Sequence, residues 1–263
     1  MASCGGLVIY QPTESLPLTD RRPSISLREA FGIQQGTRMP TIVFASSKGG
    51  AGKSTSAVLL ATQLAEQGAE VTLIDADPNR HVAVWANKPG RPPNITVVAD
   101  VTEQTVIRQI DDAARQTAFV IVDLEGTASR MVVYAMSRAD LVVIPTQASL
   151  LDALEAAAAV REVKRQEEAF RRPIRAAILL NRTSAAIRTR MMQSIAEEMR
   201  EAGVEIFSMQ LHDREAYRQL FALGGTVRSL DPKQVRNIDA AAQNADAFAA
   251  EVVSMLQPAE EVT

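Results

Sequence analysis

Short apolar runs alternate with longer stretches of helical periodicity along most of the chain. Each run is rich in β-branched or other apolar residues and is bounded by polar or turn residues, which is typical of a buried strand. The runs cover residues 41–45, 71–74, 95–99, 119–122, 141–144 and 176–180. Helical spacing between and after them predicts helices, among them 81–88, 105–116, 150–172 and 240–256. Strands that alternate with helices favour an α/β fold with a mainly parallel twisted sheet and helices on both faces.

The pattern divides the chain into one large domain and two flanking segments. Residues 1–40 contain scattered prolines and charges, and we expect an N-terminal extension that lies on the core or is partly disordered. A short helix over 26–31 is predicted within it. Residues 41–257 form the predicted large domain, and 258–263 form an acidic tail. With 263 residues and 46% hydrophobic composition, the chain can bury one substantial core.

Composition limits the cellular context and the function class. Cys4 is the single cysteine, so no disulfide framework is possible, and no signal segment or bilayer-length apolar run is present. We therefore expect a cytoplasmic protein. The formal net charge of -3 argues against a globally basic nucleic-acid binder, although it leaves a local basic patch open.

The stretch from Lys48 to Thr55 reads KGGAGKST and joins a predicted strand to a predicted helix, which is the context of a phosphate-binding loop. Backbone N–H groups surround a polyphosphate closely only where no Cβ intervenes, and the following helix N-terminus adds partial positive charge. Lys53 would neutralise the β- and γ-phosphates, and the Ser54 hydroxyl would ligate Mg²⁺. The predicted nucleotide contacts are Gly49, Gly50, Ala51, Gly52, Lys53, Ser54 and Thr55.

Further acidic residues follow two other predicted strands. Asp75 and Asp77 come after one strand, where ligands sit in such sheets, although Asp77 could instead make an Asx-type turn before Pro78. Asp123 ends another buried strand, where a carboxylate is costly unless it meets a cation, and Mg²⁺ would supply that partner. Gly126 would offer its N–H to the γ-phosphate. Glu125 either tunes the attacking water or is solvated.

Three segments resemble the ParA/MinD family of ATPases. In KGGAGKST, Ser47 replaces the usual first glycine and Lys48 follows it, as in the deviant phosphate-binding loop of that family. The segment from Asp75 to Asn79 is similar to the family's D-x-D-P-Q, with Asn79 in place of glutamine. Residues 209–217, MQLHDREAY, are similar to plasmid-partition ATPases and to the ParA-like ATPase that assists T-DNA transfer.

The resemblance implies a set of roles. Lys48 would reach across a homodimer interface to the nucleotide of the other subunit, and Asp77 would orient the attacking water. These two residues and Lys53 are the predicted catalytic set, while Asp75 and Asp123 would join Ser54 around Mg²⁺. Asn181 would contact adenine. The segment 181–184, NRTS, lacks the lysine and aspartate of guanine-binding motifs, so ATP is expected rather than GTP.

Arginines in the last third favour DNA contact, because family members bind nonspecific DNA through basic residues on this side of the ATP-bound dimer. Ordinary solvated helix surfaces remain the alternative. The candidate DNA-binding residues are Arg182, Arg188, Arg190, Arg214 and Arg218. The helix over 240–256 carries Asp246 and Glu251 where a membrane-binding helix would carry Lys and Arg, so no membrane attachment is expected.

These features predict an ATPase that partitions plasmid or chromosomal DNA. It would bind Mg-ATP, dimerise, associate with the nucleoid, and hydrolyse ATP when a centromere-binding or adaptor protein stimulates it. A conjugative, T-DNA-transfer or cargo-positioning ATPase is an alternative, and a small-molecule phosphoryl-transfer ligase of the same fold is a more distant one. His81 and His212, the two histidines, have no partners at metal or triad spacing and are expected to be surface or capping residues.

Overall fold

The structure of the protein is a computed structural model that describes residues 39–46, 48–126, 129–147, 149–184, 197, 199 and 203–257. The predicted helix over 26–31, the acidic tail, Arg188 and Arg190 lie outside the described residues. The predicted domain boundaries therefore stay predictions.

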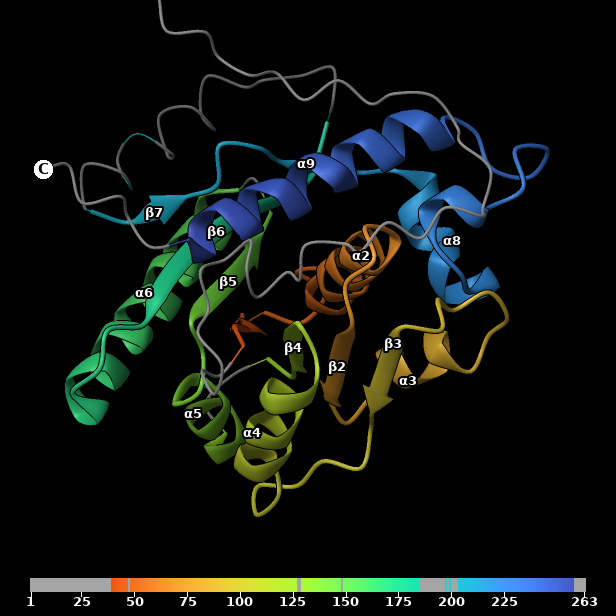
Figure 1. Cartoon of the computed structure of the whole chain (residues 1–263). Coiled ribbons are helices and arrows are strands. Elements are labelled where there is room, and N and C mark those ends of the chain that lie inside the picture. The colour runs from red at the N-terminus through yellow and green to blue at the C-terminus, as the bar shows by residue number, and fades with distance from the viewer. Residues whose placement is uncertain are drawn as a thin grey trace, which may run out of the picture.

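A parallel sheet forms the centre of the molecule (Figure 1). Its strand order is β3-β2-β4-β1-β5-β6-β7, and a further short strand, β8, pairs with β6 off this path. Every strand pair in the described residues is parallel. The strands are β1 (Thr41–Phe44), β2 (Val71–Ala76), β3 (Ile95–Val98), β4 (Phe119–Leu124), β5 (Leu141–Thr146), β6 (Arg175–Thr183), β7 (Glu205–Ile206) and β8 (Leu211–His212).

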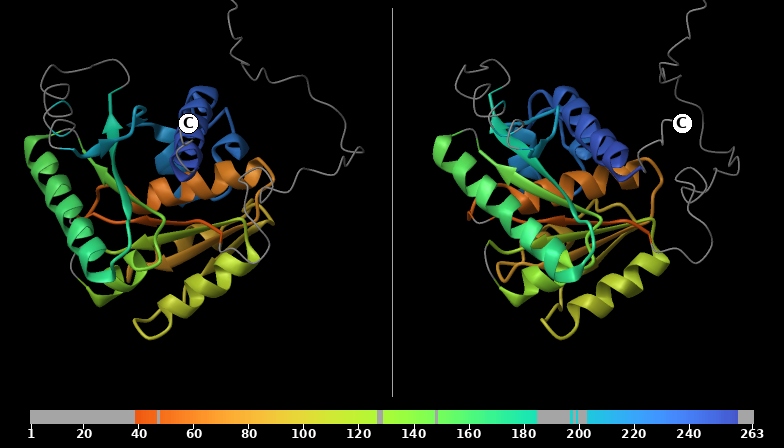
Figure 2. Two further views of the ribbon diagram at one scale, coloured as in Figure 1. Left: turned by 60° about the vertical axis from the view of Figure 1, so that its left-hand side comes forward. Right: turned by 90° about the vertical axis from the view of Figure 1, so that its left-hand side faces the viewer.

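Helices cover both faces of the sheet (Figure 2), which confirms the predicted fold class. One face packs against α2 (Lys53–Glu66), α3 (His81–Ala86), α8 (Glu215–Leu223) and α9 (Ile238–Leu256), with the 3-10 helix η1 (Val227–Ser229) beside them. The other face packs against α4 (Val106–Gln116), α5 (Arg130–Met136) and α6 (Leu150–Phe170).

The two-sided cover explains why the central strands are almost uniformly apolar. Along β1, Ile42 and Phe44 point into the core on the α2 side, whereas Val43 points into the core on the α4 side. Side chains alternate between faces in a strand, so a strand that is buried on both faces needs apolar residues at every position. This is why the strand positions were readable from the sequence.

The core on the α2 side contains a cluster of aromatic rings. Phe248 of α9 packs against Phe44 with ring centroids 6.4 Å apart and against Phe207 with centroids 5.8 Å apart. All three side chains are fully buried. Trp85 of α3, also buried, donates a hydrogen bond from Nε1 to the Gly225 carbonyl oxygen at 3.0 Å and so fixes α3 against the segment that follows α8.

The structure changes some predicted boundaries. Strands β4 and β6 continue further than predicted, so Asp123 and Asn181 lie within strands rather than after them. The helix predicted over 81–88 ends at Ala86. The elements α5, α8, β7 and β8 were not among those predicted from the sequence. No helix in the described part of the chain is long and apolar enough to span a membrane.

We predict that Phe248→Ala lowers the free energy of unfolding by about 3–5 kcal/mol, because it leaves a cavity where α9 packs against β1. Guanidinium denaturation at 25 °C measures the change. Leu154→Ala is the control, since this α6 side chain is 60% exposed and its truncation should change stability by less than about 0.5 kcal/mol. Equal effects of the two variants would contradict the central position of Phe248.

Candidate nucleotide-binding site

The loop between β1 and α2 has the backbone geometry that a phosphate-binding loop needs. Gly50 and Gly52 have φ angles of 77° and 98°, which favour glycine, and α2 begins at Lys53 directly after Gly52. A Cβ atom on Gly49 or Gly50 would meet nothing within 4 Å, so the space in front of the loop is open. A Cβ atom on Gly52 would instead come within 2.1 Å of the Asn181 Nδ2 atom.

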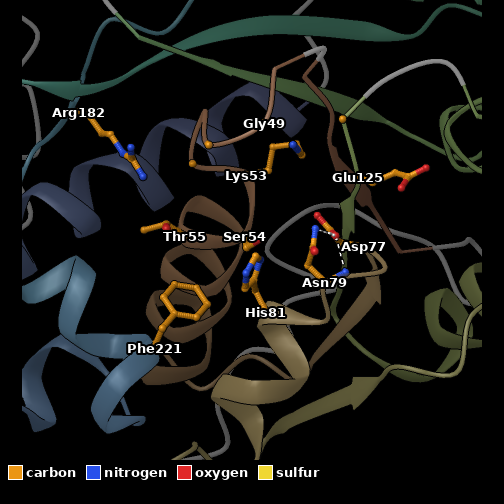
Figure 3. A pocket seen from close by; sticks show the side chains of 13 residues that line it. Gly49, Lys53, Ser54, Thr55, Asp77, Asn79, His81, Glu125, Arg182 and Phe221 are labelled. Atoms are coloured by element: carbon orange, nitrogen blue, oxygen red, sulfur yellow. Dashed lines mark hydrogen bonds between the residues drawn. The ribbon is translucent and has the colours of Figure 1, made fainter.

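A cavity of about 480 Å³ opens in front of this loop (Figure 3). Its volume is suited to a ligand of nucleotide size. Of the predicted nucleotide contacts, Gly49, Gly50, Gly52, Lys53, Ser54, Thr55 and Gly126 line it, whereas Ala51 and Asn181 do not. The other lining residues come from distant segments and are Asp77, Asn79, His81, Glu125, Arg182 and Phe221.

Strand register places Asp123 next to the loop. On β4 it lies opposite Asp75 of β2 on one side and Phe44 of β1 on the other. Asp123 is fully buried, and neither of its carboxylate oxygens has a hydrogen-bond partner among the described residues. Burial is the main reason that its pKa is raised from 3.8 to about 7, and Asp75 and Asp77 raise it further, while Ser54 and Lys53 act in the opposite direction.

This buried carboxylate fits the predicted magnesium site. A hard divalent cation takes oxygen ligands, and Mg²⁺ typically uses one or two protein oxygens together with phosphate oxygens and water. Asp123 has its oxygens free of other partners in the described structure, and Ser54 lines the cavity beside it. No group of three or more His, Cys, Asp or Glu side chains suited to a metal occurs in the described residues, so the phosphates would supply the remaining ligands.

Asp75 differs from the prediction in its surroundings. It is 2% exposed and does not line the cavity. Its Oδ2 atom accepts a hydrogen bond from Ala83 N at 2.8 Å, and its Oδ1 atom accepts one from Asp77 N at 3.3 Å. Burial raises its pKa, and these two backbone hydrogen bonds oppose the shift. The observed contacts make Asp75 a positioning residue for Asp77 and α3, and a place around Mg²⁺ stays a prediction.

Asp77 lines the cavity and also makes the turn that the sequence left open. Its Oδ1 atom accepts hydrogen bonds from Asn79 N at 2.8 Å and from Asn79 Nδ2 at 2.9 Å (Figure 3). The side chain is 8% exposed. The Asx-type turn thus holds the Asp77 carboxylate at the rim of the cavity, and Asn79 stabilises it through both backbone and side chain.

Asn181 lies behind the loop rather than in the cavity. Its Nδ2 atom donates to the Ala51 carbonyl oxygen at 3.1 Å and to Ser56 Oγ at 3.3 Å, and its Oδ1 atom accepts from Arg182 N at 2.8 Å. The side chain is 4% exposed. Because both ends of this amide are engaged, the predicted adenine contact requires an exchange of partners and is not part of the described arrangement.

Lys48 is held within its own chain. Its Nζ atom lies 2.5 Å from Asp152 Oδ1, while Ser149 Oγ, at the N-terminus of α6, donates to Asp152 Oδ2 at 2.5 Å. Burial acts to raise the pKa of Asp152, but the bonds from Lys48 and Ser149 outweigh it and lower the pKa. The hydrogen bond between Lys48 and Asp152 also raises the pKa of Lys48. Contact with a second subunit stays a prediction for Lys48.

The described DNA-binding candidates have three different surroundings. Arg182 lines the nucleotide cavity. Arg218 pairs with Asp213, and Arg214 is half-buried and lies close enough to Tyr217 to lower the pKa of its hydroxyl, against the larger effect of burial. DNA binding by these residues therefore stays a prediction.

His81 and Phe221 are site residues that the sequence did not reveal. His81 begins α3 and Phe221 lies on α8, and both line the cavity with ring centroids 6.4 Å apart and an interplanar angle of 80°. Neither residue belongs to a motif or stands at a characteristic sequence spacing from KGGAGKST, so no sequence pattern points to it. His81 was expected to be a surface or capping residue, and it is exposed, but at the cavity.

Comparison with known proteins agrees with the family resemblance seen in the sequence. The model of the VirC1 protein family matches residues 39–256. The chain is 46% identical to "Protein ParA" of Rhizobium radiobacter over 221 residues, which cover 84% of this chain and 99% of that protein. The predicted resemblance to ParA/MinD-type ATPases near the plasmid ParA proteins is confirmed by these matches.

Solved structures share the fold at low sequence identity. The ATP complex of a single-residue variant of McdA from Cyanothece superposes with a TM-score of 0.67 and 17% identity, over 83% of this chain and 98% of that one. MinD from Pyrococcus horikoshii in complex with Mg-ADP has a TM-score of 0.60 and 15% identity, over 84% and 99%.

We predict that Asp123→Asn removes a pH-dependent loss of stability in the protein free of nucleotide and metal. The folded state holds the Asp123 proton up to about pH 7, but the unfolded state releases it near pH 4. The folded state therefore binds more protons between these values, and the free energy of unfolding falls as pH rises through this window. The full loss is on the order of 4 kcal/mol.

Denaturation series between pH 4.5 and 8 in the presence of a chelator measure this effect. The Asn variant should show a flatter dependence than the wild type. Asp100→Asn is the matched control, because this carboxylate is 99% exposed and its loss should leave the slope unchanged. Parallel curves for the wild type and the Asp123 variant would contradict the burial argument.

Proposed function

The chain belongs to the VirC1 protein family, and from this relationship we propose that it is a ParA-type ATPase whose ATP-dependent dimer binds nonspecific DNA. The relationship to ParA supports a partition-type role. The main structural support is the site itself. A glycine loop at the start of α2 faces a cavity of nucleotide volume, and the buried carboxylate of Asp123 lies next to that loop.

In the proposed chemistry, one set of residues binds the nucleotide and the metal ion, and a different residue orients the attacking water. The loop N–H groups, the α2 N-terminus and Lys53 bind the triphosphate, and Ser54 and Asp123 hold the metal ion. Bound Mg²⁺ neutralises part of the phosphate charge. Asp77, fixed by its turn at the cavity rim, accepts a hydrogen bond from the attacking water and orients it. Phosphoryl transfer depends mainly on such positioning and charge neutralisation.

The proposed dimer switch involves Lys48. In the single chain its ammonium group is paired with Asp152, and the loop residue itself is 45% exposed. In the dimer this ammonium group would contact the phosphates bound by a second copy of the chain. Such an exchange would leave the buried Asp152 carboxylate with its hydrogen bond from Ser149, so it would be favourable only while the phosphates of the second copy are in place, and hydrolysis would reverse it.

DNA binding and partner stimulation complete the proposal. The ATP-bound dimer would hold the nucleoid through phosphate contacts from arginines, and a centromere-binding or adaptor protein would stimulate hydrolysis. A conjugative or T-DNA-transfer ATPase is the second candidate, favoured by the resemblance of the segment 209–217. A phosphoryl-transfer ligase would differ by requiring a small-molecule acceptor for turnover and by ignoring DNA.

We predict that Lys53→Ala and Asp77→Ala separate binding from hydrolysis. Lys53→Ala should weaken ATP binding by about 10- to 100-fold, since it removes charge-assisted hydrogen bonds, and should abolish ATP-dependent dimerisation. Asp77→Ala should keep ATP affinity but lower turnover by about 100-fold or more and trap the dimer. Calorimetry, light scattering and phosphate release measure these three quantities.

Asp77→Asn is the matched control for the turn. Its amide oxygen can still accept the hydrogen bonds from Asn79, so the turn is preserved while the charge is lost. Turnover as low as in the Ala variant would assign the effect to the carboxylate itself. Normal turnover in both variants would remove Asp77 from the mechanism.

We predict that random-sequence duplex DNA binds only with Mg-ATP and that affinity falls steeply with salt, because the contacts are to phosphates. Electrophoretic shifts with Mg-ATP, Mg-ADP or no nucleotide across a salt series measure this. Replacing Arg188, Arg190, Arg214 and Arg218 with Ala should weaken DNA binding without changing ATP affinity. Removing four arginines from α4 and α6, Arg108, Arg115, Arg161 and Arg165, controls for net charge. Equal losses in both variants would contradict the assignment.

A further inference from the structure

The nucleotide cavity has two ends of different chemistry. At one end Asp77, Asn79 and Glu125 lie beside Lys53 and the loop, where polar groups suit the terminal phosphate and the attacking water. Figure 3 shows Arg182, Thr55 and Phe221 on the opposite side of Lys53 and Ser54, with Thr55 between the other two. Arg182 and Phe221 are therefore available to the part of a nucleotide that extends away from the terminal phosphate.

Phe221 is held in place by two helices. It lies on α8, half-buried, and His81 at the start of α3 packs against its ring in an edge-to-face arrangement. Trp85, one turn further along α3, is bonded to the Gly225 carbonyl oxygen just after α8, so the two helices are fixed to each other. The ring is thus presented to the cavity by two helices that are fixed to each other.

Arg182 reaches the cavity from β6, where its backbone conformation is constrained. Its φ angle is 53°, which a non-glycine residue rarely adopts, and its N–H is bonded to Asn181 Oδ1 at 2.8 Å. Asn181 is buried and bonded to the loop, so the side chain that follows it turns toward the cavity and remains exposed. A planar guanidinium group in this position can lie against a flat ring.

We propose that Phe221 and Arg182 form the nucleoside end of the cavity and contact the base of the bound nucleotide, with His81 as the positioning residue for Phe221. This rests on the proposed nucleotide binding and names the part of the site that recognises the base. Aromatic rings and guanidinium groups bind any base through its π-face. The contacts therefore add affinity for a nucleoside over a bare polyphosphate, with little discrimination between adenine and guanine.

Calorimetric titration of the full chain with Mg-ATP, Mg-GTP and Mg-tripolyphosphate tests the proposal. Phe221→Ala should weaken ATP and GTP binding by about tenfold or more, because a stacking contact is lost, and should leave tripolyphosphate binding unchanged. Phe221→Tyr keeps the ring and should retain nucleotide affinity. Leu223→Ala is the matched control on the same helix, because this side chain is 40% exposed and does not line the cavity.

Arg182→Lys separates stacking from charge. The lysine keeps the positive charge but not the flat surface, so ATP binding should weaken while tripolyphosphate binding stays the same. Equal losses for ATP and tripolyphosphate in Arg182→Ala, with full affinity in Arg182→Lys, would make Arg182 a phosphate contact and overturn its place in the proposal.

The outcomes distinguish this inference from the function on which it rests. Unchanged ATP affinity in Phe221→Ala, or equal losses for ATP and tripolyphosphate, would overturn the base contact while nucleotide binding stands. If the wild-type chain bound neither ATP nor tripolyphosphate, both the base contact and the proposed ATPase function would fail. Circular dichroism of each variant establishes that it is folded.

Discussion

The buried carboxylate of Asp123 is the constraint on which the site depends. It lies in the middle of a parallel sheet, beside Asp75 in register. Neither oxygen has a partner at ordinary hydrogen-bond geometry in the described part of the chain, and only the neighbouring Ser54 hydroxyl and Lys53 favour its charged form. An unpartnered carboxylate in such surroundings is costly, and the protein meets this cost in part by keeping the proton to about pH 7. A divalent cation would relieve it more completely, so ligand binding and folding stability are coupled at this residue.

The loop in front of Asp123 is built from both halves of the sheet. Gly52 admits the Asn181 amide at a distance that a Cβ atom would forbid, and through this contact the end of β6 supports the loop that follows β1. Asp75 supports the opposite rim in the same way, since its carboxylate accepts N–H groups from Asp77 and α3. The buried side chains of Asn181 and Asp75 thus support the two sides of the cavity from behind. The residues of the loop that face the ligand are therefore free to contact it.

Much of the fold and the phosphate end of the site could be predicted, because the signals are contiguous. A strand buried on both faces is apolar at every position, and KGGAGKST carries its geometry within a few residues. The contacts of Asn181 with Ala51 and of Lys48 with Asp152 join residues 130 and 104 positions apart, and no local pattern encodes them. The same holds for the His81–Phe221 pair, since its two helices meet only after the sheet has formed. The family resemblance suggested an adenine contact for Asn181, and only the structure shows that its amide lies behind the loop.

Charge pairing within the chain explains why net charge says little about its partners. Arg218 pairs with Asp213, Arg228 pairs with Glu66 and Asp246, and Lys48 pairs with Asp152. An external anion must compete with an internal carboxylate for each of these cations. The Arg218 and Arg228 pairs are partly exposed and contribute little stability, whereas Lys48 pairs with the buried carboxylate of Asp152 and is harder to displace. These cations are therefore available to an anion only when it displaces a carboxylate, whereas an uncompensated basic surface would bind anions at all times.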